Sequence, residues 1–205
     1  MARLDSETAQ RYLRKFVDIS GECKSVMDKI KSEYIDGASG AKKWTTPKGG
    51  EFMDAVSLKF ADYNKQFNTA YQGALDAFLI QANAILESEH IQPIATMSIT
   101  ELPVSMAKSW TPDLNGGYVD FGFDTFTSTF LANNINELKG YIGQMQDELR
   151  GAVQYGFDSS FLNGLLSELD SLKTSAQSVA DEYSTKAVND AIAEAGDLNK
   201  LRTAT

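Results

Sequence analysis

The sequence predicts an all-α protein, an elongated four-helix arrangement of two antiparallel helical hairpins. Three observations predict this fold class. Apolar residues recur at alternating steps of four and three over four long stretches, which is the spacing of a helix that packs along one seam. Glycine-containing turns separate the first stretch from the second and the third from the fourth. Prolines and glycines fill the segment between the second and third stretches, which excludes one continuous helix.

The first helix is expected to run from about Glu7 to Tyr34, with Ser6 as its N-cap. It should end at the turn 36–40, where two glycines supply the C-cap and turn conformations. Its apolar positions form one seam, which consists of Tyr12, Phe16, Ile19, Cys23, Val26, Ile30 and Tyr34.

The second helix is expected from about Glu51 to Glu87, after a basic and flexible turn that contains Trp44. At 1.5 Å per residue each helix of this first hairpin would be roughly 40–55 Å long. Helices of that length need a partner along the whole apolar seam. The second seam consists of Phe52, Val56, Phe60, Tyr63, Phe67, Ala70, Ala74, Phe78 and Ile85.

The segment 91–124 reads as a crossover, in which Pro93, Pro103 and Pro112 prevent a continuous helix. The runs 94–100 and 118–123 carry β-branched and aromatic residues in partial alternation, with turn-forming residues between them. This pattern leaves open a small β-hairpin. We expect Trp110 to pin the crossover to the helices.

The second hairpin should begin with a helix from about Thr125 to Gln154. Asp158 suits the N-cap of the last helix, which we expect to fade near Glu194, leaving a polar, frayed tail over 196–205. The third seam consists of Leu131, Ile135, Leu138, Ile142, Met145, Leu149 and Ala152. The fourth consists of Leu162, Leu165, Leu169, Leu172, Ala176, Val179, Tyr183 and Ala187.

These elements give a hairpin over 1–90, the crossover over 91–124 and a hairpin over 125–205 that packs on the first as one domain. Neither hairpin alone can cover its seam, so the two should pack together or recruit a second chain.

Composition limits the classes of partner and of chemistry. The formal charge of −9 over 205 residues argues against nucleic acid, which needs clustered Lys and Arg. Residues 1–50 nevertheless carry a net charge of +3, which either steers an acidic partner or is a solvated face. Cys23 is the only cysteine, so an intrachain disulfide is excluded. Neither a cleavable signal peptide nor a membrane-spanning helix is predicted.

The sequence predicts no catalytic, cofactor-binding or metal site, and we do not expect an enzyme. The sole histidine, His90, lies beside Glu87 and Glu89, but their spacing matches no helical ligand face. The phosphate-binding pattern G-x-x-x-x-G-K-[ST] does not occur.

Trp44 is the residue of greatest interest, because a tryptophan in a flexible turn either plugs the end of its own bundle or anchors a partner. The candidate partner-binding residues are Lys42, Lys43, Trp44, Gly49, Gly50 and Phe52.

Two long helices joined by a turn with Trp44 and Lys48-Gly49-Gly50-Glu51-Phe52 resemble the WXG-type hairpins exported by type VII secretion systems. The opening Met1-Ala2-Arg3-Leu4-Asp5, and Thr127-Ser128-Thr129-Phe130-Leu131 near the start of the third helix, are similar to LXG domains of type VII effectors. The resemblance implies a non-catalytic export or targeting module that small helical-hairpin proteins escort and a secretion ATPase handles. It also implies secretion without a cleavable signal peptide.

The chain ends at Thr205 without space for a toxin domain, so we expect an isolated targeting domain or a stand-alone exported protein. Self-association could replace the small helical partner. Two alternatives stay open: a membrane-active helical toxin that inserts the 91–124 segment, and a cytoplasmic helical adaptor.

Overall fold

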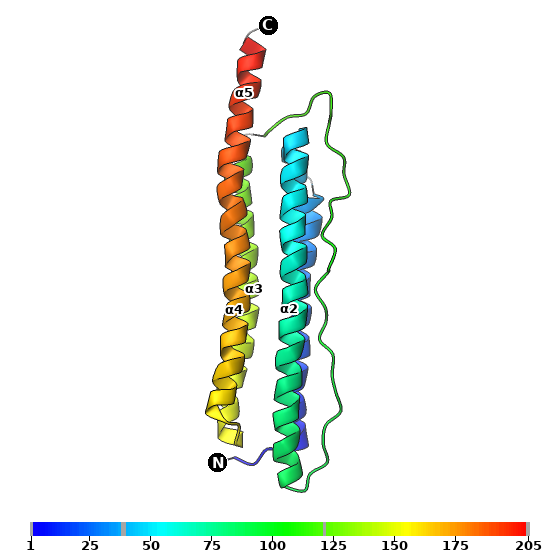
Figure 1. Ribbon diagram of the computed structural model, residues 1–205, viewed down its shortest axis with the longest axis vertical. Coiled ribbons are helices and arrows are strands. Elements are labelled where there is room, and N and C mark those ends of the chain that lie inside the picture. The colour runs from blue at the N-terminus through cyan, green and yellow to red at the C-terminus, as the bar shows by residue number, and fades with distance from the viewer. Residues whose placement is uncertain (1, 38–39, 121, 204–205) are drawn as a thin grey trace. The chain divides into compact units, whose positions relative to one another are not determined.

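The protein is an all-α helical bundle, in which most of the described residues lie in helices. The structure, a computed structural model, describes residues 2–37, 40–120 and 122–203. Four long helices account for most of the chain, and Figure 1 shows the stretch between α2 and α3 as an extended trace. No strand is assigned anywhere in the described ranges. The predicted fold class is therefore confirmed at the level of an all-α bundle.

The first two helices agree with the prediction to within a few residues. Helix α1 spans Ser6–Lys29, and a π-helical turn, η1 (Ile30–Ile35), continues it. After the short 3₁₀ turn η2 (Ala41–Lys43), helix α2 spans Pro47–Ser88. Asp5, and not Ser6, caps α1, since its Oδ1 accepts the Thr8 amide at 2.7 Å. Aspartate serves as well as serine at an N-cap.

The other two helices follow the crossover. Helix α3 spans Phe123–Gly151 and closes with the 3₁₀ turn η3 (Ala152–Tyr155). Helix α4 spans Ser159–Lys186, and Asp158 is confirmed as its N-cap, because Oδ1 accepts the Phe161 amide at 2.9 Å. A second π-helical turn, η4 (Ala187–Ala191), leads into α5, which spans Ile192–Thr203.

The expectation of a frayed tail was wrong for the described residues. The helix neither fades at Glu194 nor ends at Gly196, because α5 continues to Thr203. Alanine, glutamate, leucine, lysine and arginine dominate this stretch, and these residues favour helix strongly enough to tolerate one glycine. Glu194 itself is 9% exposed, so a tertiary contact also holds the start of α5.

The chain divides into two compact units, and each of the four long helices contributes a segment to both. The first unit comprises Met1–Ser25, Asn64–Leu102 and Leu138–Thr174. The second comprises Val26–Tyr63, Pro103–Glu137 and Ser175–Thr205. Each unit therefore contains residues of both expected hairpins and of the crossover.

Aromatic rings from different helices form the core of the first unit. Tyr12 of α1 lies 5.3 Å from Phe78 of α2, measured between ring centroids, and Phe16 lies 5.5 Å from Tyr71. Phe157, just before α4, stacks on Phe78 at 4.5 Å. Arg11 of α1 adds an ion pair with Glu148 of α3 at 3.0 Å. These contacts join α1, α2, α3 and the turn before α4 within this unit.

The second unit has two aromatic clusters. In one, Tyr34 of η1 stacks on Phe126 and Phe130 of α3, at 6.1 and 5.5 Å, and its hydroxyl lies 2.9 Å from that of Thr127. The other surrounds Trp44 and is described below. Burial raises the pKa of the Tyr34 hydroxyl well above its usual value.

The predicted seams are buried with three exceptions. Every predicted seam residue of α1, η1 and α3 is at most 3% exposed. Ala70, Ile85 and Val179 are half-buried instead. Their C-terminal neighbours Tyr71, Leu86 and Ala180 fill the core in their place. An α-helix turns every 3.6 residues, so a seam counted in steps of three and four can be one residue out of phase.

The crossover is an extended segment that lies on the helices, and we call its residues 94–113 the strap. The expected β-hairpin is not seen among the described residues; one isolated antiparallel bridge, between Trp44 and Val119, lies there instead. Side chains of α1, η1 and α2 hold the strap by its main chain, as detailed below. Ala38 and Ser39 of the first expected turn, and Phe121 of the crossover, lie outside the described residues.

Candidate interaction site

Trp44 is a plug in the core of the second unit. It is 1% exposed, and its ring lies 5.2 Å from that of Phe52 and 5.3 Å from that of Phe123. Phe52 in turn lies 5.7 Å from Tyr183 of α4. Four aromatic side chains, from the residue after η2 and from α2, α3 and α4, thus pack edge to face or tilted, an arrangement that aromatic quadrupoles favour. Trp44 offers almost no surface to a partner in this arrangement.

Glu194 in α5 binds the turn at the start of α2, residues 44–50, which we call the Trp44 turn. Its Oε2 accepts the indole Nε1–H of Trp44 at 2.5 Å and the hydroxyl of Thr46 at 2.8 Å. The Thr46 hydroxyl also accepts the Gly49 amide at 3.2 Å, so Thr46 is the N-cap of α2, and Pro47 follows at the favourable first helical position. A buried carboxylate with two donors is the pairing that burial of a charge requires.

The two glycines of the turn are needed for close packing. A Cβ on Gly49 would lie 2.3 Å from the Trp44 carbonyl oxygen and 2.7 Å from its ring. A Cβ on Gly50 would lie 2.9 Å from Cγ of Pro112 in the strap. Gly49 therefore admits the Trp44 ring over the first turn of α2, and Gly50 admits the strap.

The two candidate lysines differ in their surroundings. Lys42 is exposed. Lys43 is half-buried; its Nζ pairs with Asp120 at 3.3 Å and lies 5.3 Å from the ring centroid of Phe126. The main chain of Lys43 also accepts the Asp120 amide at 2.6 Å. Of the six candidate residues, four are buried and one is ion-paired, so Lys42 is the one with a freely accessible side chain.

A surface hollow adjoins this cluster in the second unit. Charged side chains of both signs line it, so it does not select for net charge. Its lining residues are Trp44, Lys48, Glu51, Phe52, Ala55, Tyr183, Lys186, Asp190 and Ala193.

Lys186 also donates a hydrogen bond to Glu182. This bond lowers the pKa of Glu182 and raises that of Lys186 itself.

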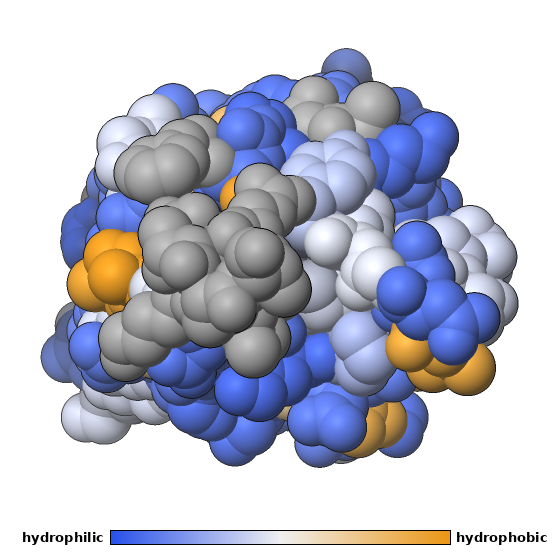
Figure 2. Space-filling model, turned by 90° about the horizontal axis from the view of Figure 1, so that it is seen from above, coloured by the Kyte–Doolittle hydropathy of each residue, from blue (hydrophilic) through white to orange (hydrophobic). Residues whose placement is uncertain are grey.

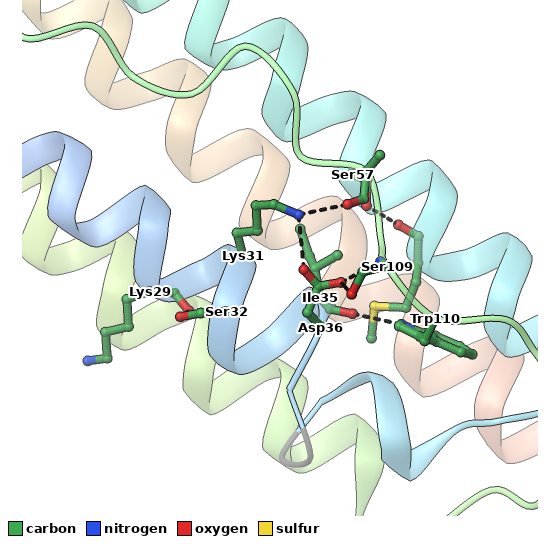
Figure 3. Close-up of polar contacts among 10 residues, drawn as sticks. Lys29, Lys31, Ser32, Ile35, Asp36, Ser57, Ser109 and Trp110 are labelled. Atoms are coloured by element: carbon green, nitrogen blue, oxygen red, sulfur yellow. Dashed lines mark hydrogen bonds and ion pairs between the residues drawn. The ribbon is translucent and has the colours of Figure 1, made fainter.

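In the second unit, η1 holds the strap through charged and polar groups (Figure 3). Lys31 Nζ donates to the Ala107 carbonyl at 2.7 Å and pairs with Asp36 at 3.0 Å. Asp36 Oδ1 accepts the Ser109 amide at 2.6 Å and its hydroxyl at 3.0 Å. Trp110 donates Nε1–H to the Ile35 carbonyl at 2.9 Å, which confirms that it pins the crossover. Burial raises the pKa of Asp36, but the donors from Ser109 and Lys31 lower it by more.

In the first unit, three amide side chains of α2 hold the strap. Asn68 donates Nδ2–H to the Leu102 carbonyl at 2.9 Å and accepts the Leu102 amide at 2.8 Å. Asn83 makes the same pair of bonds with Ile94, at 3.0 and 2.8 Å. Gln72 accepts the Ile99 amide at 2.9 Å and donates to the Met97 carbonyl at 3.1 Å.

One hydroxyl of α1 completes this set, since Ser20 Oγ accepts the Thr100 amide at 2.8 Å. Sequence reasoning missed all four side chains, and Glu194 as well. A signal was present for three of them, because Asn68, Gln72 and Asn83 interrupt an apolar helix on one face, at steps of four and eleven.

No group of three or more His, Cys, Asp or Glu side chains that could hold a metal ion is found among the described residues. None of the described helices is long and apolar enough to cross a membrane. On the face drawn in Figure 2, hydrophilic residues dominate and apolar residues form small separate patches. Burial raises the pKa of the Cys23 thiol far above its usual value, which disfavours the reactive thiolate.

Neither a protein-family model, nor a curated protein, nor a solved structure matches this chain.

Proposed function

We propose that this protein is a non-catalytic export or targeting module of the type VII secretion kind, which acts by protein–protein recognition and leaves the cell as a folded helical bundle. The proposal rests on the resemblance of the Trp44 turn, the chain start and the third helix to LXG and WXG-type domains. The observation that supports it best is the role of the Trp44 turn, which joins two long helices and is buried against the C-terminal helix.

We propose further that the helices pair as two antiparallel hairpins. Tyr12 of α1 contacts Phe78 of α2, whereas Phe16, one turn later, contacts Tyr71, two turns earlier on α2. Such a reversed order of contacts supports an antiparallel pair. Between α3 and α4, Gln146 donates to the Leu166 carbonyl at 3.0 Å across the turn that ends at Asp158.

The resemblance implies that the partner is a small helical-hairpin protein. Such a partner is not required to cover the seams, because their residues are already buried within this chain. We therefore propose that recognition uses side chains that are exposed beside the Trp44 turn. Lys42 and Lys48 are exposed there, and their charge would favour an acidic partner surface.

Secretion assays test this proposal. The protein should appear in the culture medium of a host with a type VII system, and this fraction should vanish when the secretion ATPase is deleted. Export that persists without the ATPase would refute the type VII route. The hypotheses of a cytoplasmic adaptor and of a membrane-active toxin would then remain.

The surface that contains Lys42 and Lys48 has its own test, with a matched control. Lys42→Glu combined with Lys48→Glu should reduce export or partner capture without loss of helicity by circular dichroism. Lys29→Glu, an exposed lysine on α1, should leave export unchanged. Equal effects of the control and the double variant would remove this surface from the proposal. Trp44→Ala is less informative, because it removes a core residue.

A further inference from the structure

The strap in the first unit is bound like a peptide ligand. Four side chains, Asn68, Gln72, Asn83 and Ser20, pair with seven main-chain groups of residues 94–102. No helix or strand is assigned to this described stretch. The strap therefore owes its extended conformation to the side chains of the helices and not to a hydrogen-bond ladder of its own.

Main-chain readout of this kind does not depend on the identity of the bound residues. A carboxamide offers one donor and one acceptor, and every residue except proline presents the complementary amide and carbonyl. Grooves that bind extended peptides obtain affinity from such main-chain bonds and selectivity from pockets for particular side chains.

Three apolar anchors supply the selectivity in this groove. Ile94 and Ile99 are each 8% exposed, and Leu102 is 1% exposed. Most of the side chains between them, such as Thr96 and Glu101, point to solvent. The groove therefore fits an extended chain with large aliphatic residues at positions i, i+5 and i+8.

We propose that the groove formed by Ser20 of α1 and Asn68, Gln72 and Asn83 of α2 is a binding site for extended polypeptide, and that a second copy of this chain can fill it with its own residues 94–102. In the single chain the strap occupies the groove in cis. A second copy is the occupant to which the structure points, because its segment 94–102 is the one whose anchors and main chain fit here. Each copy carries both groove and ligand, so exchange is reciprocal.

The tethered strap competes with any strap that arrives from another molecule, because tethering gives it an effective concentration in the millimolar range. Exchange should thus be rare in the wild-type protein at low concentration. Exchange should become dominant in a mixture of two variants, one with a weakened strap and the other with a weakened groove.

A complementation experiment with two full-length variants tests the proposal. One variant, Ile99→Ser with Leu102→Ser, removes two apolar anchors of the strap and leaves the groove unchanged. The other, Asn68→Ala with Gln72→Ala, removes two hydrogen-bonding side chains of the groove and leaves the strap unchanged. Mixed in equal amounts, they should form a one-to-one dimer by analytical ultracentrifugation, twice the 22.5 kDa chain mass, while each alone sediments as a monomer. A mixture that sediments as two monomers would overturn the proposal.

Recognition of the main chain is tested with a labelled synthetic peptide of residues 91–105 and the variant that carries Ile99→Ser and Leu102→Ser. Fluorescence anisotropy should give saturable binding, and N-methylation of the peptide at Leu102 should weaken it by about tenfold or more, since it removes the donor to Asn68. Equal binding of the methylated peptide would overturn the inference.

Hydrogen exchange on the wild-type chain covers the case in which a variant fails to fold. The amides of Ile94, Ile99, Thr100 and Leu102 should exchange together, and faster than the amides of α2 in the same unit, because release of the strap does not require unfolding of the helix. If these amides exchange only as slowly as the α2 amides, the strap does not leave the groove and the proposal fails.

Discussion

Removal of the Glu194 carboxylate should destabilise the second unit strongly, although the residue lies near the end of the chain. In Glu194→Ala, the indole N–H of Trp44 and the hydroxyl of Thr46 lose their acceptor, and both residues are at most 2% exposed. A buried donor left unpaired costs about 1–3 kcal/mol. Two such donors, less the desolvation that the carboxylate no longer suffers, give an expected loss of about 2–4 kcal/mol.

Urea unfolding followed by tryptophan fluorescence is the appropriate assay, because Trp44 and Trp110 both belong to the second unit. With an m-value of about 2 kcal/mol/M, the loss corresponds to a fall in the midpoint of about 1–2 M. Glu194→Gln retains one acceptor oxygen and should lose only about 1 kcal/mol. Asp190→Ala, an exposed acidic residue one turn earlier, should stay within about 0.5 kcal/mol of the wild type. A Glu194→Ala midpoint equal to that of Asp190→Ala would refute the role assigned to Glu194.

Two further predictions concern the Trp44 turn and the strap. Gly49→Ala should lose about 2–3 kcal/mol through overpacking against Trp44, whereas Gly73→Ala, where an added Cβ meets no atom within 4 Å, should be neutral or stabilise by up to about 1 kcal/mol. Thermal melts of both variants check this pair, and equal melting temperatures would contradict it. Asp36→Asn should destabilise the protein at neutral pH, because the lowered pKa of Asp36 means that its carboxylate stabilises the fold above about pH 4 and ceases to do so as the pH falls below that value. Urea midpoints of the variant and the wild type should therefore move closer together as the pH falls through the lowered pKa of Asp36, and a difference that does not shrink with falling pH would contradict the assignment.

The helices could be predicted from the sequence because their apolar spacing is strong and long. The seam positions were less certain, since a step of three or four residues only approximates the helical repeat. At Ala70, Ile85 and Val179 the approximation selected the residue one place before the buried one. Phase errors of this kind depend on how each helix rotates against its neighbours, which the local pattern does not record.

The C-terminal helix was missed for a different reason. Its local pattern is weakly amphipathic and polar, which favours a frayed end. The contact that holds its first turn comes from Trp44 and Thr46, about 150 residues earlier in the chain. Contacts between residues so far apart are not visible in a single sequence.

The candidate site could be predicted in part. The importance of Trp44 and of the glycines beside it follows from their residue types, and the structure gives each a packing role. The burial of Trp44 could not be fixed in advance, because the sequence was consistent both with a plug and with an exposed anchor. The crossover was recognised from its prolines, but its extended course was not predicted. The amides that bind the strap lie on a helix whose apolar seam dominated the interpretation.

The reactivity of Cys23 tests most directly whether this chain covers its own seams. Cys23 is fully buried in the first unit, and it is the only thiol in the protein. Reaction with a chromogenic disulfide reagent should be at least about 100-fold slower in the native protein than in urea, because a buried thiol must first be exposed. The protection should be independent of protein concentration from about 1 to about 100 µM, since it arises within one chain. A thiol that reacts at the unfolded rate would show that the seam is not covered, and a thiol that is protected only at high concentration would show that a second molecule covers it. Either result would contradict this account.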